Sequence, residues 1–169
     1  MKKPTIFYVK AGLIAALYVV LTLPFASFSY GPIQFRVAEA LTIIPLYETA
    51  AIPGLFIGCM FANIFGGFGL VDIVFGSLTT LLAAYLTSKA PNMYIGVLPP
   101  ILLNALIIPI WVSKMSYTPY LATVGTIGFG QFLSAGILGV ILATAIEILT
   151  KTHTLTIIFI FRKIDMIII

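Results

Sequence analysis

Long apolar runs, interrupted by Pro, Gly and isolated charges, fill most of the sequence. A membrane-spanning helix needs about 20 consecutive apolar residues, so runs of this kind predict helices that cross a bilayer. The pattern predicts six helices, near residues 6–26, 35–46, 49–65, 71–88, 94–113 and 119–149. We therefore expect an all-α membrane protein that forms one six-transmembrane-helix bundle.

The predicted helix at residues 35–46 is too short to cross a bilayer at about 1.5 Å per residue. It must tilt or be covered by other parts of the protein, because backbone groups exposed to lipid lack hydrogen-bond partners. Short or broken membrane helices are typical of solute-binding regions.

We expect the bundle to be a single transmembrane domain at residues 1–150, followed by a short cytoplasmic tail at 151–169. The apolar run of the tail, Leu155 to Phe161, is too short for a seventh span. An interfacial segment or a loosely ordered extension fits the tail better.

Composition supports a membrane protein and argues against other classes. Hydrophobic residues make up 61% of the chain and charged residues 8%, and the mean hydropathy is +1.17. The net charge of +4 does not indicate a nucleic-acid partner, because the basic residues flank apolar runs as membrane anchors do. There is no Walker A sequence, no metal-ligand cluster and no Ser/His/Asp set, and Cys59 is the only cysteine. We expect neither an enzyme nor a cofactor.

Basic residues lie beyond alternate predicted helices. With a cytoplasmic N-terminus, the outside segments hold only Arg36 and Lys114. The inside segments hold the other basic residues: Lys2, Lys3, Lys10, Lys89, Lys151, Arg162 and Lys163. The positive-inside rule then places both termini of this cell-membrane protein in the cytoplasm.

Polar side chains collect toward the outside ends of the predicted helices, where a solute is first met. The set comprises Gln34, Arg36, Glu39, Asn63 and Asp72, with Asn104 and Gln131 about half a helix deep. An ionised group at such depth costs about 2.5 kcal/mol or more unless it faces protein or water, so these side chains should point inward. We expect them to line a pocket that opens outward and binds a solute.

Structural roles for the same residues stay open. Arg36 and Glu39 are three residues apart and pair with each other in one alternative. Asp72 caps its helix in another, because an acid in the first turn meets the positive end of the helix dipole. In a third, the amide side chains only join neighbouring helices, with hydrogen bonds of about 0.6 kcal/mol each.

Two further features lie at the outside ends. The connection from Gly66 to Gly69 is glycine-rich, which fits a lid or a tight turn. Aromatic side chains there fit a membrane-interface belt or a stacking face for a flat ligand. They are Phe28, Tyr30, Phe35, Phe65, Phe68, Trp111, Tyr117 and Tyr120.

Small residues recur at a spacing of four on the first predicted helix. Ala11 pairs with Ala15 and Gly12 pairs with Ala16, which makes a flat stripe along the helix. Such stripes let helices approach closely. This stripe is our candidate surface for docking a partner protein.

Several segments together resemble the QueT family. They are GPIQFRVAEAL at 31–41, IPGLFIGC at 52–59, Ala62-Asn63 and DIVFGS at 72–77. That family comprises the substrate-binding (S) subunits of energy-coupling-factor (ECF) transporters assigned to queuosine precursors. The resemblance covers roughly residues 6–150, and Ala11 with Ala15 matches the motif by which such subunits dock on a transmembrane coupling protein.

The resemblance implies a six-helix S-component fold and capture of a 7-deazaguanine-type substrate, such as queuine or its aminomethyl precursor. It also implies ATP-driven uptake with an EcfT-like transmembrane coupling protein and two cytoplasmic ATPase subunits. Glu39 and Asp72 are then candidates for amine or guanine-edge recognition, completed by Asn63, Asn104 and Gln131.

Other functions remain open from the sequence. They are an S subunit for another vitamin, a stand-alone ion-coupled carrier that uses Glu39 or Glu147, and a membrane assembly subunit whose polar residues only join helices.

Overall fold

Helices make up almost all of the computed structural model, which describes residues 3–30 and 34–151. In chain order they are α1 (Lys3–Thr22), η1 (Leu23–Phe25), α2 (Ala26–Ser29), η2 (Val37–Leu46), α3 (Ala51–Ile64), α4 (Gly69–Val71), η3 (Asp72–Gly76), α5 (Ser77–Thr87), α6 (Met93–Gly96), α7 (Leu98–Ile107), α8 (Pro109–Met115), α9 (Tyr120–Gln131), η4 (Phe132–Leu138) and α10 (Gly139–Lys151). No strand occurs in this part of the chain. The expected all-α class is therefore confirmed for these residues, and residues 152–169 of the predicted tail lie outside them.

Consecutive helices join into long apolar segments. Three of these, Pro4–Phe25, Gly69–Thr87 and Tyr120–Thr150, are long and apolar enough to cross a membrane within the described ranges. Met93–Ile107 and Pro109–Met115 meet at an angle of 40° and form a fourth if they are one bent span. Pro109 explains the bend, because proline lacks the N–H that continues a helix. The chain is a multi-pass membrane protein.

The expected count of six spans is not confirmed. Every predicted range contains helix, but Val37–Leu46 and Ala51–Ile64 are shorter apolar helices. Val37–Leu46 is also a 3₁₀ helix and not an α-helix, and Arg36 before it is extended, with φ −107° and ψ 110°.

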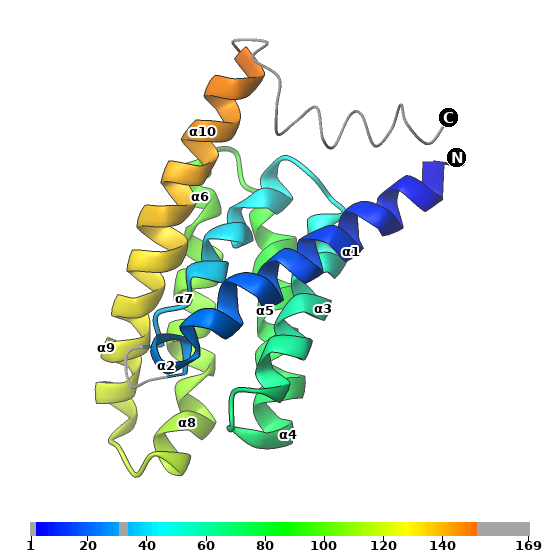
Figure 1. Ribbon diagram of the computed structural model, residues 1–169. Coiled ribbons are helices and arrows are strands. Elements are labelled where there is room, and N and C mark those ends of the chain that lie inside the picture. Colours follow the sequence, from blue (N-terminus) through cyan, green and yellow to red (C-terminus); the bar gives the residue numbers. More distant parts are fainter. Residues whose placement is uncertain (1–2, 31–33, 152–169) are drawn as a thin grey trace.

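α1 crosses α3 at very close range, and the two lie side by side in Figure 1. A Cβ atom on Gly54 would lie 2.7 Å from the carbonyl oxygen of Ala11, and one on Gly58 would lie 2.8 Å from the Cβ of Tyr18. Glycine therefore permits this approach. Ala11 and Ala15 are both buried in the contact.

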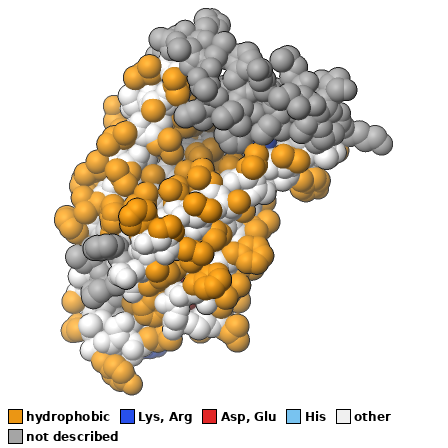
Figure 2. All heavy atoms as spheres, in the orientation of Figure 1, with side chains coloured by type: hydrophobic (Ala, Val, Ile, Leu, Met, Phe, Trp, Pro, Cys, Tyr) orange, Lys and Arg blue, Asp and Glu red, His pale blue; other side chains and the backbone are white. Residues whose placement is uncertain are grey.

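Apolar packing joins the other elements around η2. Ile43 of η2 packs with Val97 and with Ala143 of α10. A separate cluster on α8 and α9 contains Trp111 and Ile127. Orange hydrophobic side chains also cover much of the face seen in Figure 2, as expected for helices that meet lipid.

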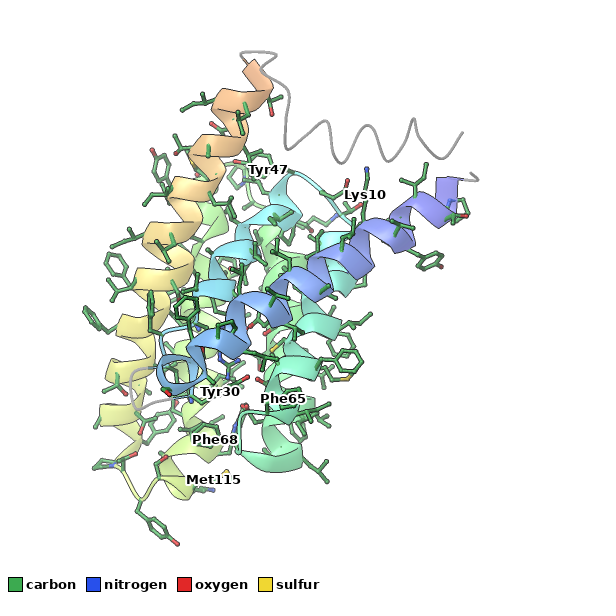
Figure 3. The ribbon with its side chains drawn as sticks, in the orientation of Figure 1. Lys10, Tyr30, Tyr47, Phe65, Phe68 and Met115 are labelled. Atoms are coloured by element: carbon green, nitrogen blue, oxygen red, sulfur yellow. The ribbon has the colours of Figure 1, made fainter. Side chains whose placement is uncertain are left out.

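The two ends of the molecule differ in their residues. Figure 3 places Lys10 and Tyr47 at one end and Tyr30, Phe65, Phe68 and Met115 toward the other. At the first end Lys10 Nζ lies 3.1 Å from Glu48 Oε2, and the Tyr47 hydroxyl donates to Glu147 over 2.9 Å. None of these four residues lines the polar cavity of the molecule.

Candidate solute-binding site

All the polar residues that the sequence predicts for a pocket line one cavity. They come from the segment before η2 and from η2, α3, η3, α7 and α9: Gln34, Arg36, Glu39, Asn63, Asp72, Asn104 and Gln131. Gly76, Thr80 and Ile108 complete the wall of the cavity, whose volume is about 10 Å³, so a solute larger than a water molecule requires the wall to open. Each of the predicted side chains is buried. The fold thus brings distant parts of the chain to one enclosed polar space.

Glu39 projects from η2 toward α1. Its Oε1 accepts a hydrogen bond from the Tyr18 hydroxyl at 2.5 Å, and both side chains are buried. Its Oε2 has no hydrogen-bond partner within the described ranges. Tyr18 therefore fixes the carboxyl group and leaves one oxygen for another donor.

Asp72 is held by three other side chains. Its Oδ1 accepts a hydrogen bond from the indole nitrogen of Trp111 at 3.1 Å, and its Oδ2 lies 3.9 Å from a guanidinium nitrogen of Arg36. Its backbone carbonyl accepts a hydrogen bond from the Asn63 amide at 2.9 Å. Asp72 also lies in the first turn of the continuous helix that begins at Gly69, so the alternative in which it meets the positive end of the helix dipole stands beside these contacts.

Arg36 lies just before η2 in extended backbone. Its Nε donates to the carbonyl of Ser29 at 3.2 Å, and its guanidinium carbon lies 4.8 Å from the centre of the Tyr30 ring. The alternative in which Arg36 pairs with Glu39 is therefore wrong: Arg36 is outside the helix that carries Glu39, and its salt bridge is with Asp72.

Buried polar atoms without a hydrogen-bond partner concentrate on this cavity. Each such atom costs about 1–3 kcal/mol when it stays unpaired away from water. Among the described residues they are Gln34 Nε2, Glu39 Oε2, Asn63 Oδ1, Asp72 Oδ2, Asn104 Nδ2 and Gln131 Oε1. Every one of them belongs to a residue of the cavity wall, so the wall has unused capacity for several hydrogen bonds.

The backbone of Gln34 is strained. Its φ is 49°, in the left-handed region that residues other than glycine rarely adopt. Strain of this kind persists where the surrounding structure imposes it, and it concentrates at binding sites. Here it accompanies a side chain that is buried on the cavity wall.

Among the expected aromatic residues, Tyr30 and Trp111 contact residues of the cavity wall, and the side chain of Phe28 lies outside the part that the structure describes. Tyr30 packs over Gly66 and donates to the carbonyl of Ala62, and Trp111 is buried against Asp72. Phe65, Tyr117 and Tyr120 are exposed. The glycine-rich connection is a tight turn, with Gly67 at φ 79° and Gly69 at φ 69°.

Sequence reasoning missed the supporting roles of Tyr18 and Trp111. A tyrosine in the middle of a membrane helix needs a hydrogen-bond partner for its hydroxyl, and that rule was a usable signal for Tyr18. Trp111 looked like a belt residue, because nothing in the sequence shows that the bend before α8 turns it toward η3.

The small residues of α1 divide into two faces. Ala11 and Ala15 are buried against α3, so they pack within the chain. Gly12 and Ala16 are exposed, and a Cβ on Gly12 would meet nothing within 4 Å. Only the second pair is accessible to a partner protein in this structure.

The helical fold and the enclosed cavity define a multi-pass membrane protein with a polar internal site. The sequence matches the family model described as QueT transporter over residues 8–148. The chain belongs to the QueT transporter family, so it is a transporter and not an enzyme.

A curated relative supports this membership. The chain is 34% identical over 149 residues to the queuosine precursor transporter QueT of Lactococcus lactis subsp. cremoris (strain MG1363). The alignment covers 79% of this chain and 88% of that protein. No solved structure matches the chain.

Proposed function

We propose that the chain is the substrate-binding subunit of an ECF-type ABC importer and that it captures a queuosine precursor of the 7-deazaguanine type. The observation that carries the proposal is the enclosed cavity, whose wall holds buried polar atoms with no hydrogen-bond partner. The family and the printed name of the Lactococcus relative support the substrate class.

The chemistry of the cavity suits this class of ligand. A 7-deazaguanine presents a ring N–H and an exocyclic amine, and Glu39 Oε2 and Asp72 Oδ2 are acceptors for such donors. The amide of Asn104 has a free donor for the ring carbonyl. The cavity wall holds two carboxyl groups and one guanidinium group, so a ligand with an ammonium group, such as an aminomethyl precursor, would balance its charge.

Selectivity follows from the same unpaired atoms. A wrong ligand that leaves one of them without a partner loses about 1–3 kcal/mol for each such group. A small cavity of this kind distinguishes between ligands by their hydrogen-bonding groups more than by the apolar surface area that they bury.

Energy for uptake comes, in this proposal, from an EcfT-like coupling protein and two ATPase subunits. The site faces outward and both termini are cytoplasmic, as the distribution of basic residues suggests. We place docking on the exposed Gly12 and Ala16 of α1, because Ala11 and Ala15 are already used against α3.

The substrate is tested on purified protein. Mass spectrometry should find a queuosine precursor bound, and calorimetry with queuine, its aminomethyl precursor and the nucleoside should give one site per chain. Glu39→Gln should weaken binding roughly 30-fold or more, since loss of a buried, ligand-paired carboxylate costs about 2 kcal/mol or more. Glu48→Gln is the matched control, because Glu48 pairs with Lys10 and does not line the cavity.

Two results would separate substrate from transporter class. Binding of another vitamin and of no deazapurine would overturn the substrate and leave the S-subunit proposal standing. Uptake by vesicles that contain only this chain, without coupling protein or ATPases, would instead favour a stand-alone carrier.

A further inference from the structure

A second, larger depression lies between two antiparallel helical segments and is separate from the polar cavity. One wall is formed by α4, η3 and α5, and the other by α7 and α8. Its volume is about 600 Å³, and its lining is apolar except for Thr79 and Lys114. We call it the α5–α8 groove.

The groove follows from the helix geometry. Val71, Phe75, Leu78 and Leu82 are spaced by four, three and four residues, so they share one face of the continuous helix Gly69–Thr87. On the other side, the bend of 40° before Pro109 changes the direction of the chain between α7 and α8. Ile107 of α7 and Ile110 of α8 line the groove on either side of that bend.

The length of the groove matches one leaflet of a bilayer. Leu82 follows Val71 by eleven positions, which at about 1.5 Å per residue is a rise of about 16 Å. That is about half of a hydrocarbon core of roughly 30 Å. The groove is therefore about as long as the acyl-chain region of one leaflet and too short to span the whole hydrocarbon core.

A lysine stands at the end of this apolar groove. Lys114 is in the last turn of α8, it is exposed, and it lines the groove beside Met115. Figure 1 shows α4 and α8 at the same end of the molecule, and Figure 3 places Met115 there. A helix end of this kind lies at the level of the lipid headgroups, where an ammonium group meets phosphate.

We propose that the α5–α8 groove binds a phospholipid with a net negative headgroup, with an acyl chain along Phe75, Leu78 and Leu82 and the headgroup at Lys114. The arrangement of one cation above a leaflet-deep apolar groove complements such a lipid in both charge and length. An apolar protein segment would use the groove but leave the Lys114 charge unmatched.

The bound lipid touches the wall of the polar site. Trp111 lines the groove, and its indole nitrogen donates to Asp72 in the polar cavity. One face of a single side chain thus meets the lipid while its N–H holds a cavity carboxylate. A lipid in the groove consequently packs against Trp111, the residue that positions Asp72.

Trp111 also provides the test, because it is the only tryptophan in the chain. The protein is placed in phosphatidylcholine nanodiscs that contain a few mole per cent of phosphatidylglycerol brominated on its acyl chains, and bromine quenches tryptophan fluorescence at short range. We expect quenching that corresponds to about fivefold enrichment over the bulk fraction, since one lysine near an anionic lipid contributes about 1 kcal/mol. Brominated phosphatidylcholine at the same fraction should show no enrichment.

Two pairs of variants make the result specific. Lys114→Gln should remove the enrichment, whereas Lys89→Gln, an exposed lysine after α5 that lies over Tyr85, should keep it. Leu78→Phe, which fills the groove, should reduce quenching by the brominated lipid, and Leu86→Phe, on the same helix outside the groove, should not.

Three outcomes would overturn the proposal. One is equal quenching by the two brominated lipids in the unmodified protein. Another is enrichment that survives Lys114→Gln. The third is loss of coupling-protein binding in Leu78→Phe with no change in quenching, which would make the groove a protein-docking surface.

Discussion

The indole N–H of Trp111 donates to Oδ1 of Asp72 over 3.1 Å, and 39 residues separate the two in sequence. The same Asp72 lies against Arg36 through its other oxygen and receives the Asn63 amide at its backbone carbonyl. One aspartate therefore connects α8, α3 and the segment before η2. The position of the cavity carboxylate depends on a residue that also lines the α5–α8 groove.

Replacement of Trp111 by Phe should destabilise the ligand-free protein. Phenylalanine keeps an aromatic ring but removes the N–H, so the buried Oδ1 of Asp72 loses its partner at a cost of about 1–3 kcal/mol. Thermal unfolding in detergent measures the effect. Tyr94→Phe, which changes an exposed aromatic residue on α6, is the control and should melt like the unmodified protein. Equal melting of the two variants would mean that the hydrogen bond contributes nothing.

The tyrosine on α1 should matter for ligand binding through Glu39. Tyr18→Phe removes the hydroxyl that fixes Glu39 Oε1, so the carboxyl group turns more freely and loses its preset orientation. We expect the free energy of ligand binding to weaken by about 1–2 kcal/mol, so the dissociation constant measured by calorimetry should rise roughly five- to thirtyfold. Tyr8→Phe, on the exposed face of the same helix, should bind as the unmodified protein does. An unchanged constant for Tyr18→Phe would show that Glu39 needs no support from α1.

Much of the fold is predictable from sequence because a long apolar run in a membrane protein indicates a helix directly. The predicted range 71–88, for example, matches the continuous helix at Gly69–Thr87 within two residues at each end. The helix type at Val37–Leu46 is not predictable in this way. Whether a short apolar segment coils as 3₁₀ or α depends on what surrounds it, and hydrophobic spacing does not contain that information.

The members of the cavity were predictable, whereas their pairing was not. Polar residues deep in apolar helices must face protein, and this rule alone identifies Asn104 and Gln131. The partner of Arg36 depends on the direction of its side chain, which its extended backbone sets. The i to i+3 spacing to Glu39 predicts a pair only when both residues are in one helix. Sequence spacing predicts neighbours only inside a regular helix.

Close packing of α1 on α3 makes a clear stability prediction. Gly58→Ala should destabilise the protein by about 1–3 kcal/mol, because the new Cβ would lie 2.8 Å from the Tyr18 Cβ and 2.9 Å from the Ala15 carbonyl oxygen. Backbone cannot move aside as a flexible side chain does. Alanine is otherwise the better helix former by about 1 kcal/mol, so a loss of stability would report the contact alone.

Gly12→Ala is the matched control for that experiment. Gly12 is in a helix as Gly58 is, but a Cβ there would meet nothing within 4 Å. The thermal midpoint of Gly12→Ala should therefore stay the same or rise. A midpoint for Gly58→Ala as high as that of Gly12→Ala would contradict the close approach of the two helices.

The two faces of α1 should respond differently to bulk. Ala16→Leu adds a large side chain on the exposed face, where we propose that the coupling protein packs, so the partner helix cannot come close. We expect uptake with the full ATPase module to fall severely while ligand binding by the isolated chain stays normal. Ala15→Leu adds the same bulk against α3, near Gly58 and Tyr18, and should weaken both binding and stability.

Measurement of binding, thermal midpoint and uptake for both variants distinguishes docking from internal packing. Normal uptake in Ala16→Leu would move the partner away from this face of α1. Normal stability in Ala15→Leu, combined with lost uptake, would indicate that the coupling protein docks on Ala11 and Ala15. In that case α1 would have to separate from α3 when the transporter assembles. In the structure that parting is opposed by the glycine contacts of α3, so we expect the exposed pair to be the docking face.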